Sequence, residues 1–126
     1  MTEINVHAAE RDRLLKAIEA DPIDVYATTF GESWGKLLAQ VPEHTRRGLV
    51  RYIILGILPG EFLRAVLSND LMESFGRADD MNRQRLFFIC TFLHAAAPAD
   101  CFRGEDRMHI WASKGGWLGI SRTEPS

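Results

Sequence analysis

A carboxylate and an amide stand at positions where the apolar pattern of the chain predicts buried side chains. On a helical wheel of residues 60–75, Asp70 falls near the middle of an arc of leucine, valine and phenylalanine residues. On the wheel of residues 80–96, Asn82 aligns with leucine and isoleucine positions. A buried carboxylate without partners costs several kcal/mol or becomes protonated. We therefore expect Asp70 to point inward and to be held by hydrogen-bond donors.

The donors available to Asp70 lead to two interpretations. They are Arg51, Arg77, Asn82 and the free N–H groups of the helix that begins near residue 80. In the first interpretation, Asp70 and Asn82 join two helices by capping a helix start and satisfying backbone groups. In the second, the four side chains line a polar pocket that holds a ligand with hydrogen-bond donors and a phosphate. The structural interpretation is preferred, because most buried polar groups serve the fold.

A basic ridge is predicted on the helix expected at residues 43–56. His44, Arg47 and Arg51 group on one side of this helix, opposite a broad apolar arc. The simpler interpretation is a solvated face that pairs with acidic residues among the first forty, since isolated charge clusters are weak indications of function. The ridge is nevertheless the best candidate for contact with an anionic partner, because arginine makes bidentate contacts with carboxylates and phosphates.

The sequence lacks the usual signatures of catalysis and of metal or cofactor binding. The histidines are scattered, no CxxC pair is present, and neither a phosphate-binding glycine loop nor a GxSxG elbow occurs. Cys101 with His94 or His109 lacks a third, orienting group. Asp79 and Asp80 point in different directions at a helix start, where either is a natural N-cap. We therefore predict no catalytic residues, no metal site and no cofactor, and we lean against an enzyme.

Prolines and glycines divide the chain into helix-sized segments, and none has the alternating pattern of a strand. The fold is therefore predicted to be all-α, a compact single-domain bundle of about five to six helices over residues 1–126. The helix at 80–96 is apolar almost all round and is expected at the centre. Helices are expected at residues 5–20, 23–40 with a break around Gly31 and Gly35, 43–56, 60–75, 80–96 and 105–113.

Two groups of large apolar residues are expected to pack in the core. Phe87 and Phe88 lie on the predicted central helix, so they are interpreted as core residues and not as a base-stacking platform. Trp117 and Leu118 follow a glycine pair in the C-terminal segment. They are expected to fold back as a lid on the core, the alternative being an exposed interaction spot.

Composition and charge limit the class of protein. With 126 residues, 46% of them hydrophobic and 25% charged, the chain fits one domain with its own core. The apolar runs are shorter than the ~20 residues that span a bilayer, and the start lacks the apolar stretch of a signal peptide, so we expect a cytoplasmic protein with free thiols. Residues 1–43 carry eight acids against four bases. The net charge of −2 disfavours nucleic acid and membrane as partners.

The segment "RYIILGILPGEFLRAVLSNDLMESFGRADDMN", followed by an apolar helix and "APADCFRGEDRMHIWASKGGW", resembles a family of small, largely uncharacterised phage and prophage proteins. The resemblance covers residues 51–117 and implies a phage or mobile-element origin in a bacterial host. The chain departs from the family pattern at Phe102 and Arg103, so the resemblance assigns the loop around Cys101 no role. The matched positions of possible function are Arg51, Pro59, Gly60, Asn69, Asp70, Arg77, Asp79 and Asn82.

Three functional hypotheses follow. The first is an inhibitor of a host process, such as antiviral defence, that masks a protein partner. It requires an exposed apolar or charged patch, with Asp70 buried and fully hydrogen-bonded. The second is a protein that sequesters a nucleotide-type signal, with arginine side chains that converge on a cavity. The third, an enzyme acting through Asp70, is the least favoured.

The expected partner is therefore a host protein or a small anionic ligand. The sequence does not decide between a monomer and an oligomer. The residues predicted to bind the ligand or partner are Arg47, Arg51, Asn69, Asp70, Arg77 and Asn82.

Overall fold

The computed structural model describes the backbone of residues 3–123 and the side chains of residues 8–121. The described residues form ten α-helices, one short 3-10 helix (η1) and no strand, which confirms the all-α prediction but exceeds the predicted five to six helices. The elements are α1 Glu3–Ala20, α2 Pro22–Phe30, α3 Glu32–Leu38, α4 Glu43–Leu55, α5 Glu61–Leu67, α6 Leu71–Arg77, α7 Asp80–Gln84, α8 Leu86–Ala96, η1 Ala99–Cys101, α9 Glu105–Ser113 and α10 Gly116–Thr123.

The helix expected over residues 60–75 is two helices, α5 and α6, because the chain turns at Asn69. Asn69 adopts a left-handed conformation with φ 65°, which asparagine tolerates better than most residues. The N–H of Asp70 donates to the carbonyl of Ala65 at 3.0 Å, and that of Asn69 to Val66 at 3.1 Å. These two bonds form the Schellman arrangement that ends a helix. A single helical wheel therefore does not apply across this turn.

Further breaks account for the remaining difference in helix number. The expected break near Gly31 is present, with φ 127°. The region 80–96 is divided into α7 and α8 at Arg85, which has a non-helical φ of −104°. Gly115 and Gly116 both have positive φ, which glycine adopts without steric cost. They turn the chain into α10, a helix that the sequence patterns did not predict.

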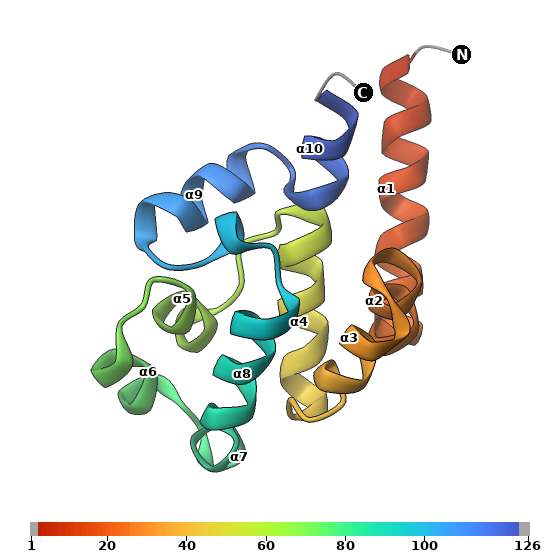
Figure 1. Cartoon of the computed structure of the whole chain (residues 1–126). Helices are drawn as coiled ribbons and strands as arrows, with labels where there is room; N and C mark the ends of the chain where they lie inside the picture. The colour runs from red at the N-terminus through yellow and green to blue at the C-terminus, as the bar shows by residue number, and fades with distance from the viewer. Residues whose placement is uncertain (1–2, 124–126) are drawn as a thin grey trace.

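Helix α4, and not the 80–96 region, lies at the centre of the fold. In Figure 1 it runs between α1–α3 on one side and α5–α9 on the other. The four consecutive residues Tyr52, Ile53, Ile54 and Leu55 are all buried. Since each residue advances 100° around a helix, four in succession cover nearly every direction. The last turn of α4 is therefore enclosed by other elements.

The aromatic residues expected in the core are partly on the surface. Phe87 is 73% exposed and Phe88 is half-buried, because α8 buries one face only. The prediction that Phe87 belongs to the core was therefore wrong. Trp117 meets the ring of Phe30 edge-on, with centroids 5.1 Å apart, yet it remains 38% exposed. Leu118 is half-buried against the core, so this segment covers the core only in part.

The C-terminal carbonyl groups of α4 are satisfied by side chains from distant helices. A helix leaves its last carbonyls without intrahelical partners. Trp111 of α9 donates its indole N–H to the Ile53 carbonyl at 3.0 Å, and Arg11 of α1 donates to the Leu55 carbonyl at 3.0 Å. These bonds attach both the first helix and the penultimate one to the end of α4.

Buried hydroxyl and thiol groups around α4 are held in their neutral forms. The Tyr52 hydroxyl donates to the Cys101 carbonyl within the core, and burial raises the pKa of Tyr52 far above its ordinary value. Burial likewise raises the pKa of the Cys101 thiol to about 12. Cys90 is exposed, and both cysteines are free thiols.

Two glycines allow α4 and α10 to touch backbone to backbone. Gly56 ends α4 with φ 73°, and a Cβ atom built there would lie 2.6 Å from the nitrogen of Gly116. A Cβ atom on Gly116 would lie 2.4 Å from the nitrogen of Gly56. No side chain fits at either position, so this contact requires glycine in both segments.

We predict that Gly56→Ala lowers the free energy of unfolding by more than about 2 kcal/mol, because it adds backbone strain and displaces α10. Gly76→Ala is the control: it lies inside α6, where a Cβ atom meets nothing within 4 Å. This change should raise stability by about 0.5–1 kcal/mol through helix propensity. Urea unfolding of the three proteins measures both effects, and equal stabilities for Gly56→Ala and wild type would contradict the prediction.

Candidate functional site

Asp70 is exposed, which corrects the expectation that it points into the core. Because the chain turns at Asn69, Asp70 becomes the N-cap of α6, and its carboxylate accepts the N–H of Glu73 at 3.0 Å. Ser74 occupies the buried position of α6 instead and donates its hydroxyl to the Asp70 carbonyl at 2.6 Å. Asp70 therefore caps a helix, but the helix is its own and not the one near residue 80.

Asp79 and Asn82 form the start of α7. The Asp79 carboxylate accepts the backbone N–H of Asn82 at 2.8 Å, which confirms the expectation of an N-cap here. This bond is the main cause that lowers the pKa of Asp79, and the hydrogen bond with His44 lowers it further. Asn82 is buried, as its place on the helical wheel predicts, and its amide oxygen accepts the Thr45 hydroxyl at 2.6 Å. The pair attaches α7 to α4.

The three side chains of the basic ridge of α4 all contact other residues of the chain. Arg51 forms an ion pair with Glu19 of α1, and Arg47 donates to the backbone carbonyl of the same Glu19 at 2.9 Å. His44 pairs with Asp79 at 2.7 Å. Arg51 therefore pairs with an acidic residue of the first helix, as the simpler interpretation predicts. Arg47 is held by a backbone carbonyl of the same helix, which positions its side chain without neutralising its charge.

Arg77 lies on a different surface from Arg51. Its guanidinium pairs with Glu73 and with Glu61, each at 2.6 Å, and these partners raise its pKa further above the ordinary arginine value. Asp70 lines the same shallow polar hollow beside α9. Because two carboxylates already pair with the Arg77 guanidinium, we expect this hollow to bind an anion only weakly.

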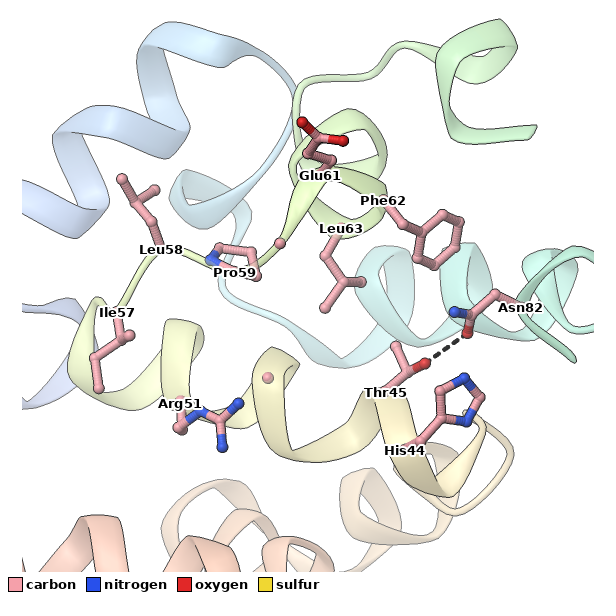
Figure 2. A pocket seen from close by; sticks show the side chains of 12 residues that line it. His44, Thr45, Arg51, Ile57, Leu58, Pro59, Glu61, Phe62, Leu63 and Asn82 are labelled. Carbon is pink, nitrogen blue, oxygen red and sulfur yellow. Dashed lines mark hydrogen bonds between the residues drawn. The ribbon is translucent and has the colours of Figure 1, made fainter. Parts of the chain in front are cut away.

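A pocket of about 380 Å³ opens beside α4 (Figure 2). Thr45 and Asn82 lie at one end, and Ile57 and Leu58 lie at the other. The nitrogen of the Asn82 amide lies on the side of Phe62 (Figure 2). The lining residues, which combine hydrogen-bonding groups with apolar walls, are His44, Thr45, Gly48, Arg51, Ile57, Leu58, Pro59, Gly60, Glu61, Phe62, Leu63 and Asn82.

The predicted four-residue polar pocket does not form. Arg51 and Asn82 line the pocket beside α4, whereas Asp70 and Arg77 line the hollow beside α9. The helix break at Asn69 is the physical reason, because it turns Asp70 away from the core. Arg51 and Arg77 therefore do not converge on one cavity, as the hypothesis of a sequestering protein requires.

Asn69 lines a third pocket, whose other residues the sequence patterns did not single out for function. This pocket, named here the Arg103 pocket, has a volume of about 370 Å³. The i, i+4 spacing of Cys90 and His94 was the available signal, because it places both side chains on one face of a helix. The lining residues are Val66, Asn69, Cys90, Leu93, His94, Phe102 and Arg103.

The thiols give no indication of nucleophilic catalysis. Burial raises the pKa of Cys90 above the ordinary thiol value, which is the opposite of the shift that activates a cysteine. Within the described residues, no group of three or more histidine, cysteine or acidic side chains is placed to hold a metal ion.

Comparisons of the chain with models of known protein families, with curated proteins and with solved structures yielded no match. The resemblance to phage and prophage proteins therefore stays a prediction. In the described part of the chain, no helix is both long enough and apolar enough to cross a bilayer.

We predict that Asp79→Ala lowers the free energy of unfolding by about 1 kcal/mol at neutral pH, the usual effect of losing an N-cap. The lowered pKa of Asp79 means that the carboxylate stabilises the fold above its unfolded pKa of about 3.9. This stabilisation is lost as the pH falls through the folded pKa. The difference between wild type and variant should therefore shrink below about pH 4.

Chemical unfolding of both proteins between neutral and acidic pH measures this difference. Asp80→Ala is the control, because Asp80 makes only an exposed ion pair with Arg83 and should change stability by less than about 0.5 kcal/mol. A constant difference across the pH range would show that the Asp79 charge does not contribute to the cap.

Proposed function

We propose that this chain is a non-enzymatic binding protein that masks an apolar surface of a protein partner through α6, α7 and the start of α8. The observation that carries the proposal is the exposure of the apolar side chains of α6. The resemblance to phage proteins makes a host protein, such as a component of antiviral defence, the expected partner.

Helix α6 presents its apolar residues to solvent. Leu71 is 60% exposed and Met72 is 80% exposed, while the one buried residue of the helix is Ser74. A surface helix of a monomeric protein normally has the reverse arrangement. Exposed clusters of large apolar side chains are typical of interaction surfaces.

The same exposure continues along the chain into the next two helices. Met81 of α7 is 53% exposed, and Phe87 of α8 is 73% exposed. Methionine adapts its shape to a partner surface, and aromatic residues supply large contact areas. Phe75 of α6 is 40% exposed as well. We name the set Leu71, Met72, Phe75, Met81 and Phe87 the docking surface.

Two of the three arginines around the docking surface are paired with acids, and the third, Arg85, stacks over the Phe88 ring. Arg77 pairs with Glu73 and Glu61, and Arg83 pairs with Asp80 at 3.1 Å. These pairs reduce the local field that would attract a charged partner. The chemistry therefore favours an apolar partner surface and complex formation that depends weakly on salt.

The competing hypotheses receive less support from the same residues. A sequestering protein needs arginines that converge on a cavity, whereas Arg51 and Arg77 line separate sites. An enzyme acting through Asp70 needs that carboxylate near a substrate pocket with a matched acid or base. Asp70 instead caps α6, so Asp70→Asn should preserve its role in the fold.

The proposal predicts that the double variant Met72→Asp, Phe87→Asp loses its partner, because charged side chains cannot be buried against an apolar surface. Immobilised wild type and variant are incubated with bacterial lysate, and captured proteins are quantified by mass spectrometry. At least one protein captured by wild type should fall by tenfold or more with the variant, and its capture should persist at high salt.

Ile110→Asp is the matched control, because Ile110 is also 53% exposed but lies on α9. This control must retain the captured protein. Equal retention by the double variant would contradict the proposal, and loss of capture at raised salt would point to the charged surfaces instead. Sedimentation of the purified chain tests whether the occupant is a second copy.

A further inference from the structure

We propose that the Arg103 pocket binds a small organic anion, through a phosphate or carboxylate group that Arg103 contacts. The pocket lies between the end of α5, one face of α8 and the loop after η1, and it has a volume of about 370 Å³. This volume is at the lower end of the range for small-molecule sites. The site is separate from the docking surface and does not depend on it.

Within the described part of the chain, the guanidinium of Arg103 has neither an acidic partner nor a carbonyl that accepts from it, whereas those of Arg47 and Arg64 donate to backbone carbonyls. Arg51, Arg77 and Arg107 each form an ion pair within the chain. The guanidinium of Arg103 instead stacks over the ring of Phe102, with its carbon 5.1 Å from the ring centroid. Among the described residues, no carboxylate lies within ion-pair distance of Arg103, so its charge is available to a ligand.

The remaining polar groups of the pocket suit an anion. Asn69 contributes an amide and His94 an imidazole, and no acidic residue of the described chain lines the pocket. His94 meets the Phe102 ring edge-on, with centroids 6.4 Å apart, so the imidazole lies beside the ring that Arg103 stacks on. Neither side chain forms a hydrogen bond with another described residue, so both can donate to phosphate or carboxylate oxygens.

The apolar part of the lining indicates that the ligand is an organic anion and not a bare ion. Val66, Leu93 and Phe102 form walls beside the polar groups, and all three are buried members of the hydrophobic core. Pockets for small molecules typically combine such walls with a few convergent polar groups. A hydrophobic body attached to the charged group would cover these walls.

The backbone holds Arg103 in a conformation that is costly for this residue type. Its φ is 85°, in the left-handed region that arginine seldom adopts. The N–H groups of Arg103 and Gly104 both donate to the Leu67 carbonyl, at 3.1 and 3.2 Å, which fixes the loop to the end of α5. Strain that the surrounding structure maintains is characteristic of binding sites.

The test uses Cys90 as a reporter, because it is the exposed thiol of the pocket while Cys101 is buried. The rate of iodoacetamide addition to Cys90 is measured by intact-protein mass spectrometry with increasing phenyl phosphate or benzoate. Bound anion should slow the reaction saturably. Benzyl alcohol is the uncharged probe and should not slow it.

Arg103→Gly is the decisive variant, because glycine adopts φ 85° without strain and therefore preserves the fold. This variant should weaken the apparent affinity for the charged probes by about tenfold or more, the effect of losing roughly one charge-assisted contact. The thermal midpoint of unfolding should rise, because glycine removes the backbone strain. Asn69→Asp, which keeps the left-handed turn but adds a negative charge, should weaken the affinity similarly. Arg107→Ala removes a paired arginine outside the pocket and should leave the affinity unchanged.

The two charged probes distinguish the sources of the anion. Stronger protection by phenyl phosphate identifies a phosphate ligand, and stronger protection by benzoate identifies a carboxylate. If neither phenyl phosphate nor benzoate protects Cys90 saturably, the proposal is overturned. Equal weakening by Arg103→Gly and Arg107→Ala would also overturn it, because it would show a general charge effect.

Discussion

Enclosure of α4 is the constraint on which the rest of the structure depends. The four residues of its last turn are buried, and buried carbonyl groups need hydrogen-bond donors from the protein. Trp111 and Arg11 provide them from helices at opposite ends of the chain. The close backbone approach of Gly56 and Gly116 belongs to the same requirement. The apolar run of α4 thereby determines where both terminal segments lie.

The sequence predicts this fold well where one helix keeps one face inward. The expected segments 43–56 and 105–113 match α4 and α9 within one residue. Prediction failed at Asn69 because helix periodicity is a local signal, whereas the turn there depends on backbone bonds to Ala65 and Val66. The Asn69-Asp70 pair, with Glu73 three residues later, was the available sign of a helix end followed by a new N-cap.

The candidate site was less predictable, because its parts come from distant segments. The wheel placed Asn82 correctly but misplaced Asp70, since an angle computed across a helix break has no physical meaning. Partners such as Glu19 for Arg51 depend on how α1 packs against α4. The free guanidinium of Arg103 could not be identified from sequence either, because charge pairing is a property of the folded chain.

The sparse anchoring of α6 has a consequence for hydrogen exchange. Only Ser74 of this helix is buried, so few contacts oppose its local opening. Its amide hydrogens should therefore exchange through a subglobal fluctuation that leaves α4 protected, and not through complete unfolding. A partner that covers α6 would order it on binding, so part of the association energy would offset the entropy of that ordering. The chain thus combines an enclosed central helix with a surface helix whose stability is separate from it.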